Sequence, residues 1–401
     1  INTNQLTTSN YISTENLLPN KQGKQKANKL PSSKTVKKYT ETDILVSNIR
    51  PYFKKIWQAD NIGGISNDVL NITSSNEKIS NDYLYYYLSQ DKFFQYMTQT
   101  SKGTKMPRGD KEAIMEFEIQ VPKNVKYQSF IGNLGKILDN KIKINNEIIA
   151  NLEELSQTLF KRWFVDFEFP DENGAPYKAN GGEMTNSELG EIPKVWRVET
   201  LEKLGSIIGG GTPSKKNKEY YTNNGIPWIT PKDLSKNRNI YISHGENDIS
   251  ELGLNKSSAK LLEKNSVLFS SRAPIGYIAI NNIPVTTNQG FKSIVPNEEM
   301  NPYFIYFILK NITPLIEQTA SGSTFKEISA KGMKSIKIVF PSIELIKQYG
   351  NIVKKYFKEI NFLENQNIKL IELRDTLLPK LMSGEIEIPD DVEVNTDELS
   401  I

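Results

Sequence analysis

The stretch NSVLFSSRAPIGYIA, residues 265–279, predicts an apolar strand, an arginine–proline turn and a second strand. A fainter version of it, DILVSNIRPYF, stands at residues 43–53. Short runs rich in Val, Ile and aromatic residues and bounded by turn residues are typical of β-strands. The same strand and turn occur at two places that lie more than two hundred residues apart. This indicates that one structural unit occurs twice. That duplication decides the fold.

Three other blocks recur in the same order in both halves of the chain. The offset between the copies stays between 217 and 223 residues, which indicates one duplicated unit with small insertions in its loops. The pairs are NYISTENL (10–17) with PWITPKDL (227–234), FEIQVP (117–122) with IKIVFP (336–341), and LSQTLFKRW from Leu155 with LRDTLLPKL from Leu373. Each unit is therefore predicted to hold a strand-rich block followed by a long helix.

The two long helices are expected to begin after Pro122 and Pro341. Apolar residues there recur at alternating spacings of three and four, which is typical of a coiled-coil seam. Asn145 and Asn367 interrupt the seams and are expected to fix the register. The seam residues are Ile131, Leu134, Leu138, Ile142, Ile149, Leu152, Leu155, Leu159 and Trp163, then Ile346, Tyr349, Val353, Tyr356, Ile360, Leu363, Leu370, Leu373, Leu377 and Leu381. Two such helices, each of roughly 38 residues or about 57 Å, are expected to pair antiparallel.

Charge is distributed unevenly, although the net charge of the 401 residues is only +3. Residues 1–126 and 195–340 each carry +6, whereas residues 127–194 carry −4 and residues 341–401 carry −5. Basic segments favour a polyanion, and acidic segments disfavour one. Two basic heads held by a helical strut would suit DNA half-sites about 34–36 Å apart, or a multiple of that. We therefore expect double-stranded DNA with a bipartite site as the partner. The alternative is a coiled-coil scaffold whose two basic heads bind proteins.

These patterns predict an α+β fold class. We expect two similar mixed α/β globular DNA-recognition domains, separated by two long helices that form an antiparallel coiled coil, with internal pseudo-twofold symmetry. The predicted parts are residues 1–126 (first recognition domain, N-terminally abbreviated), 127–166 (central long helix), 167–194 (a Gly/Pro/acidic linker), 195–341 (second recognition domain), 342–383 (distal long helix) and 384–401 (acidic tail).

Composition and motifs argue against several other classes of protein. The chain has no Cys, so disulfides and thiolate metal sites are excluded. Neither a signal peptide nor an apolar run near 18 residues is present, and a cytoplasmic location is expected. His244 is the only histidine, which excludes a His-based triad or a multi-histidine metal site. The GGGTPSKKN segment at 209–217 lacks the spacing of a phosphate-binding loop. We therefore predict no catalytic residue, metal or cofactor.

Basic and amide side chains in the expected turns are candidate DNA contacts. Arg50 and Arg272 follow the repeated strand, shifted by one position between the copies, and a guanidinium there can contact guanine or phosphate. The alternative is an exposed or salt-bridged arginine without a role in DNA contact. Asn288 and Gln289 suit adenine edges, although an Asn in such a turn is more often structural. The full set is Arg50, Lys54, Lys102, Lys105, Arg108, Thr212, Lys215, Lys216, Lys232, Arg272, Asn288, Gln289 and Lys326.

Together these motifs resemble the specificity (S) subunit of type I restriction–modification enzymes. The resemblance spans nearly the whole chain and is carried by NYISTENLLPN, DILVSNIRPYFKKIW, SIIGGGTPSKK, VLFSSRAPIGYIAI, TNQGF and SGSTFKEIS with IKIVFP. It implies two target recognition domains, helices that dock two modification (methyltransferase) subunits, and restriction (nuclease/translocase) subunits that complete the enzyme. The first block departs from the second by starting about 35 residues late.

The flanks of the two helices are the predicted docking sites for protein partners. We expect these flanks to be exposed, with core packing as the alternative for Trp163. The candidates are Arg162, Trp163, Phe164, Lys380 and Met382.

Overall fold

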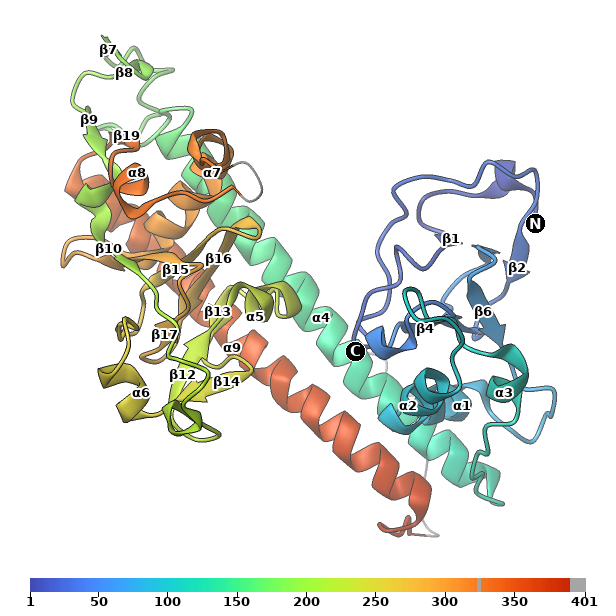
Figure 1. The fold of residues 1–401 in the computed structure, drawn as a ribbon. Helices are drawn as coiled ribbons and strands as arrows, with labels where there is room; N and C mark the ends of the chain where they lie inside the picture. The colour runs from blue at the N-terminus through green and yellow to red at the C-terminus, as the bar shows by residue number, and fades with distance from the viewer. Residues whose placement is uncertain (323–325, 390–401) are drawn as a thin grey trace. The chain divides into compact units, whose positions relative to one another are not determined.

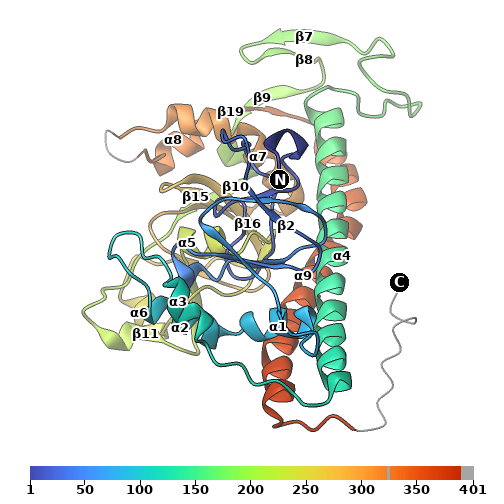
Figure 2. The same cartoon turned by 90° about the vertical axis from the view of Figure 1, so that its right-hand side faces the viewer.

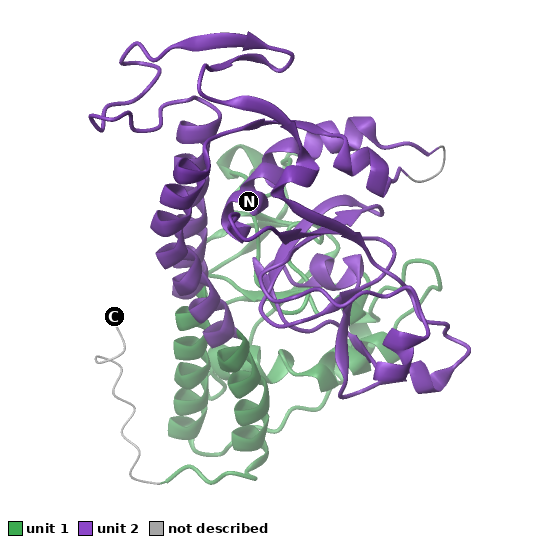
Figure 3. Cartoon of the chain, turned by 90° about the vertical axis from the view of Figure 1, so that its left-hand side faces the viewer, with its two compact units in different colours: residues 1–143, 368–401 green, residues 144–367 purple. Residues whose placement is uncertain are grey.

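The computed structural model describes residues 1–322 and 326–389 (Figure 1). It contains two compact units (Figure 3): unit 1 combines residues 1–143 with the chain from residue 368, and unit 2 consists of residues 144–367. Each unit holds a mixed α/β globular part and sections of two long helices, α4 (Val125–Phe164) and α9 (Ile343–Ser383). The predicted fold class is confirmed. From residue 390 on, the predicted acidic tail lies outside the described residues.

Unit 1 is built on two three-stranded sheets, ordered β1-β5-β2 and β4-β3-β6. Strand β3 is buried along its whole length and pairs antiparallel with both of its neighbours. The Ser80 and Asp110 side chains accept backbone N–H groups at the starts of α1 and α3, which satisfies donors that a helix leaves open. The elements are η1 (Thr3–Gln5), β1 (Tyr11–Ile12), β2 (Lys37–Tyr39), β3 (Ile44–Ser47), η2 (Pro51–Phe53), β4 (Ile56–Gln58), β5 (Gly63–Ile65), β6 (Val69–Ile72), α1 (Asn81–Leu88), α2 (Asp91–Gln99) and α3 (Lys111–Met115).

Aromatic residues of α1 and α2 form the main core of unit 1. They pack against β3 and β4 on one side and against the end of α9 on the other. The buried residues are Ile44, Val46, Ile56, Tyr83, Leu84, Tyr85, Tyr86, Tyr87, Leu88, Phe93, Phe94, Met97, Ile114, Ile131, Leu378, Leu381 and Met382. These tyrosines are therefore core residues, and unit 1 needs the last turns of α9 to complete that core.

Unit 2 contains a five-stranded sheet, β10-β18-β15-β16-β13, and a four-stranded one, β11-β14-β12-β17. It also contains two separate two-stranded sheets, β7-β8 and β19-β9. Helix α7 begins at Pro302 after Asn301, whose side chain accepts the Phe304 N–H. The elements are β7 (Met184–Ser187), β8 (Gly190–Pro193), β9 (Arg197–Thr200), η3 (Leu201–Leu204), β10 (Gly205–Gly209), η4 (Lys218–Tyr220), β11 (Tyr221–Thr222), β12 (Ile226–Ile229), α5 (Pro231–Lys236), β13 (Tyr241–Ile242), β14 (Asn247–Ile249), α6 (Glu251–Asn255), β15 (Val267–Ser271), β16 (Ile275–Asn281), β17 (Thr286–Thr287), β18 (Lys292–Pro296), α7 (Pro302–Thr319), α8 (Ala330–Lys334) and β19 (Lys337–Phe340).

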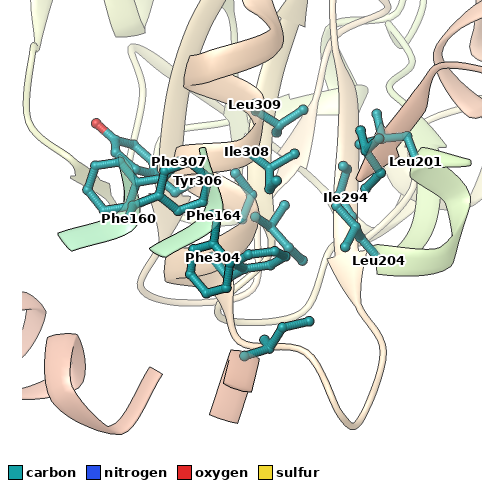
Figure 4. Packing of buried hydrophobic residues seen from close by; sticks show 14 of the residues in the cluster. Phe160, Phe164, Leu201, Leu204, Ile294, Phe304, Tyr306, Phe307, Ile308 and Leu309 are labelled. Atoms are coloured by element: carbon teal, nitrogen blue, oxygen red, sulfur yellow. The ribbon is translucent and has the colours of Figure 1, made fainter. Parts of the chain in front are cut away.

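The main core of unit 2 joins helix α7 to the long helices and the five-stranded sheet. Figure 4 shows Phe160 and Phe164 of α4 beside Phe304 and Phe307 of α7. The Phe164 and Phe304 rings meet edge to face at 4.9 Å, a geometry that adds to the gain from burial. Burying each such side chain stabilises the fold by about 1.5–3 kcal/mol.

The duplication is visible in the strand order of the two units. Strands β6-β3-β4 of unit 1 and β18-β15-β16 of unit 2 follow the same antiparallel order. A parallel pair accompanies each, with Tyr11 beside Gly64 in β1 and β5 and Trp228 beside Thr286 in β12 and β17. The repeat predicted from the sequence is therefore a repeat of topology.

Sections of α4 and α9 lie side by side within each unit (Figure 2). In unit 1, Arg374 donates to Asp139 at 2.6 Å. In unit 2, Asn145 donates to Asn367 at 2.8 Å, and the Tyr349 hydroxyl donates to the Ser156 carbonyl at 3.0 Å. In unit 2 the residue numbers rise along one helix as they fall along the other, so the pairing there is antiparallel, as predicted.

The predicted seam is wrong at Leu155 and Leu373. These side chains are 56% and 47% exposed, while their neighbours Ser156 and Arg374 turn inward. A straight helix drifts by about 20° per heptad relative to a strict 3.5-residue repeat, and the shift to the next residue follows that drift. It occurs at equivalent positions of the two copies, which are 218 residues apart.

The predicted linker, residues 167–194, contains the β7-β8 hairpin and an aromatic stack. The Phe169 ring stacks on Tyr177 at 4.5 Å and on Trp196 at 5.0 Å. Its first part is therefore attached to unit 2 by packing. In the described part of the chain, no helix has the length and hydropathy needed to cross a bilayer.

Candidate nucleic-acid interface

One end of the five-stranded sheet of unit 2 gathers charged residues from three separate segments. The Ser271 N–H at the end of β15 donates to the Gly290 carbonyl just before β18, and the Ile328 N–H donates to Ser271. Lys292, the first residue of β18, pairs with Gly209, the last residue of β10. The strand order thus brings the ends of β15 and β10 and the start of β18 to the same end of the sheet.

An ion-pair cluster occupies this end of the sheet. Glu327 accepts from Arg272 at 3.1 Å through Oε2 and pairs with Lys292 at 3.4 Å through Oε1. The side chains of Arg272 and Glu327 are each 34% exposed, whereas that of Lys292 is 12% exposed. Of the two hypotheses for Arg272, the structure without DNA shows the ion pair. Sequence reasoning missed Lys292 and Glu327 because their pairing joins segments that lie far apart in the sequence.

Next to this cluster, the GGG segment serves close packing. A Cβ at Gly210 would lie 2.0 Å from the Asn288 carbonyl oxygen, and one at Gly211 would lie 2.4 Å from backbone atoms of Ser258 and Ala259. Such distances exclude any side chain. The glycines therefore let the segment after β10 pass against its neighbours, which agrees with the rejection of a phosphate-binding loop.

The predicted amide contacts differ in their surroundings. The Asn288 side chain accepts the Gly290 N–H at 2.9 Å, which is the structural role given as its alternative. Gln289 is exposed and accepts a hydrogen bond from the Thr212 hydroxyl. Gln289 and Thr212 thus remain candidates for contact with a ligand.

The predicted lysines of unit 2 fall into two groups. Lys215, Lys216 and Lys326 are exposed, and within residues 1–322 and 326–389 none of them forms an ion pair. Lys232 donates to Glu246 at 2.9 Å, and Lys236 shares the same carboxylate oxygen at 3.2 Å. Their hydrogen bonds hold the pKa of the Glu246 carboxyl below its usual value. The ammonium groups of Lys215, Lys216 and Lys326 are therefore more available to an anionic ligand than that of Lys232.

In unit 1 most of the predicted cations are already paired. Lys54 meets Asp91 at 2.7 Å, Lys102 meets Asp110 at 2.5 Å and Arg108 meets Asp68 at 3.4 Å. Arg50 and Lys105 are exposed. The hydrogen bond to Asp110 raises the pKa of the Lys102 ammonium.

The backbone shows that the two predicted turn arginines are not equivalent. Arg50 (φ 51°) and Ala273 (φ 52°) both adopt the left-handed conformation before a proline, so these two positions correspond. The backbone of Arg272 bridges to Glu327 as that of Ile49 bridges to Arg108. Where unit 2 places an arginine against a glutamate, unit 1 therefore places an isoleucine against an arginine.

Three of the five predicted docking residues are not exposed. Trp163 and Phe164, each 7% exposed, belong to the core of unit 2. Met382, 6% exposed, lies in the core of unit 1, where its sulfur accepts from Gln90 at 3.1 Å. The predicted exposure of Phe164 and Met382 is wrong because apolar side chains at the helix ends fill the globular cores, and Trp163 takes the core packing given as its alternative. Arg162 and Lys380 are exposed, and Lys380 pairs with Glu385 at 2.8 Å.

A buried carboxyl links α9 to the sheet of unit 2. Glu364 is 3% exposed, and its two oxygens accept the N–H groups of Ile240 at 2.6 Å and Tyr241 at 3.0 Å. Burial raises its pKa to about 7, against the two hydrogen bonds, which lower it. No turn or motif in the sequence marks this residue. It fixes β13, the edge strand of the five-stranded sheet.

The described residues contain no cluster of three or more His, Cys, Asp or Glu side chains that could hold a metal. His244 is exposed. The arrangement offers cations, amides and a hydroxyl at strand ends, which suit binding of an anionic polymer more than bond-making chemistry.

Residues 2–154 and 193–373 match the family described as type I restriction modification DNA specificity domain. The HindI type I specificity subunit of Haemophilus influenzae is 27% identical over 402 residues, which cover 86% of each chain. The MjaIX specificity subunit of Methanocaldococcus jannaschii is 39% identical over 186 residues, covering 46% of this chain and 42% of that protein. The match to the methanogen protein thus spans less than half of its length.

A crystal structure of the type I restriction–modification S subunit from M. genitalium has a similar fold. The TM-score is 0.57 over 98% of this chain and 92% of that chain, at 17% sequence identity.

Proposed function

Because the chain belongs to the type I restriction–modification DNA specificity family, we propose that it is the DNA-recognition subunit of such an enzyme. The globular part of unit 1 recognises one half-site and that of unit 2 recognises the other. The chain itself performs no chemistry. Two modification subunits carry out methyl transfer, and restriction subunits join them to cleave DNA.

The observation that carries this proposal is that both units contain the same three-stranded arrangement, with different charged residues at the corresponding strand ends. Strands β6-β3-β4 and β18-β15-β16 share their order, whereas Ile49 and Arg108 of unit 1 correspond to Arg272 and Glu327 of unit 2. Base sequence is recognised by side chains at base edges, and phosphate contacts only position the protein. Equivalent scaffolds with different side chains therefore suit two different half-sites.

The paired helices are proposed to set the length of the unread spacer. Helix α4 has 40 residues and α9 has 41, or about 60 Å each at 1.5 Å per residue. The buried Asn145–Asn367 contact supports a single register, because a polar pair in an apolar seam is satisfied in only one alignment.

Exposed apolar residues on the two helices are proposed to dock the modification subunits. Leu155 and Leu373 occupy equivalent positions of the repeat and are 56% and 47% exposed. Contiguous exposed apolar surface marks contact sites, and Ile144, Ile148 and Leu155 recur at helical spacing along α4 with 38–56% exposure. The equivalent leucines, one in each copy, suit two copies of one partner.

Methylome sequencing of cells that carry the chain with its partner subunits tests the proposal. We expect a bipartite methylated site. Deleting seven residues from α4 and the matching seven from α9 should shorten its spacer by about three base pairs, because a heptad rises about 10.5 Å. An insertion of seven residues in the turn between β7 and β8 is the control and should leave the spacer unchanged. Unsplit sites, or a spacer insensitive to both deletions, would contradict the proposal.

A further inference from the structure

Glu327 lies between two cations and uses a separate oxygen for each. Its Oε2 is 3.1 Å from Arg272 Nη1, and its Oε1 is 3.4 Å from Lys292 Nζ. A guanidinium has five N–H donors, and within the described residues this contact is the single ion pair of Arg272. Most of its donors thus remain available to a ligand.

The backbone fixes Glu327 in this place. Its N–H donates to the Ser321 carbonyl at 3.0 Å, and its own carbonyl accepts the Ser321 N–H at 3.2 Å. On the next residue, the Ile328 N–H donates to Ser271 at 3.2 Å. With its backbone held in this way, Glu327 keeps its carboxylate within reach of Arg272 when DNA approaches.

A carboxylate beside Arg272 affects the binding of a phosphate and of a guanine edge differently. A phosphate carries negative charge and is repelled by Glu327 at this range. A guanine edge offers two neutral acceptors, O6 and N7, which a guanidinium can contact as a pair. Glu327 therefore weakens phosphate binding more than base binding.

We propose that Glu327 is a specificity-determining positioning residue that restricts Arg272 to base edges and neutralises Lys292. This inference rests on the proposed function, since it assumes that this end of the five-stranded sheet faces DNA. The repeat supports it independently. Arg108 occupies the corresponding position in unit 1, so the scaffold does not require a carboxylate there.

The test compares Glu327→Gln with the unaltered chain, each assembled with its modification subunits. Binding is measured by fluorescence anisotropy on a 40-base-pair duplex with the mapped site and on one whose second half-site is scrambled. We expect Glu327→Gln to bind the scrambled duplex more tightly, with a salt slope steeper by about one to two. The ratio of specific to non-specific affinity should fall by about tenfold.

Glu299→Gln is the matched control. It removes the same charge, from a residue that pairs with Lys347 at 3.8 Å and lies beyond the Pro296 end of β18, opposite to Lys292. An equal effect of both substitutions, or an unchanged ratio for Glu327→Gln, overturns the inference.

Arg272→Lys keeps the experiment decisive if Glu327→Gln lowers the melting temperature. A lysine keeps the charge but cannot make the paired contact, so the ratio should fall without tighter binding to the scrambled duplex. A ratio that Arg272→Lys leaves unchanged overturns the inference. If the unaltered assembly binds both duplexes equally, the proposed function itself fails. If the unaltered assembly discriminates between the two duplexes and both variants show the same affinity ratio, only the proposed role of Glu327 is rejected.

Discussion

The two globular parts share a three-stranded core but differ in what extends it. In unit 2, β10 and β13 flank the shared strands, whereas the described residues of unit 1 give three strands. Glu364 anchors β13 from α9, and the residue that corresponds to it in the other copy, Asn146, is exposed. The common strands hold the fold, and the additions and edge residues distinguish the two copies.

The largest expected difference between the copies lies at the equivalent positions Arg374 and Ser156. Arg374 is 12% exposed and donates to Asp139 and Asp375. Arg374→Ala removes the ion pairs but leaves Asp139 with the Tyr86 hydroxyl and Asp375 with Lys21, so it should cost about 3 kcal/mol, the lower end of the range for a buried pair. Ser156→Ala keeps the backbone carbonyl that Tyr349 uses and should cost about 1 kcal/mol. Urea unfolding measures both, and equal costs would contradict the asymmetry.

Glu364 should make the stability of unit 2 depend on pH. Its pKa is about 7 in the fold and near 4.5 when exposed. The folded state therefore holds the extra proton between these values, and stability falls as pH rises through this window. The loss should reach about 3 kcal/mol. Melting temperatures between pH 5 and pH 8 should fall less steeply for Glu364→Gln than for the unaltered chain. The exposed Glu359→Gln is the control, and a slope that Glu364→Gln leaves unaltered would exclude this role.

The triple glycine of unit 2 has no counterpart in the other copy. Substitutions at two of its adjacent positions should differ in their effect on stability. Gly210→Ala would place a methyl group 2.0 Å from a backbone oxygen, whereas Gly209→Ala would meet the Lys292 side chain at 3.8 Å. The first should destabilise unit 2 by about 1–3 kcal/mol and the second by less than about 1 kcal/mol. Calorimetry distinguishes them. Equal effects would mean that the segment is not tightly packed.

The smallest effects are expected at the exposed lysines. Lys105→Ala in unit 1 and Lys215→Ala in unit 2 should each reduce the salt slope of DNA binding by about one. Preference among bases should not change, because a phosphate contact carries no sequence information. Titrations at several salt concentrations measure this, and an altered methylation site would assign these lysines to base contact instead.

Periodicity and repetition made the architecture predictable, because both are properties of local sequence. The two helix seams follow from residue spacing, and their antiparallel pairing follows from the repeated order of block and helix. The inward turn of Ser156 and Arg374 was missed because it depends on helix drift against a particular neighbour. The pairing of Lys292 with Glu327 depends on strand register between segments far apart in sequence. The burial of Phe164 and Met382 was not predicted, because sequence does not show which globular part covers a helix end.

The shared use of α9 has a consequence for the order of folding during synthesis. Unit 1 takes its first 143 residues from the start of the chain, yet its core includes Leu378, Leu381 and Met382. A ribosome that has made the first globular part has therefore not yet made the residues that close it. Unit 2 uses one continuous segment, residues 144–367, and all of it emerges earlier. The part translated first is thus completed last, and its apolar face needs protection from aggregation in the interval.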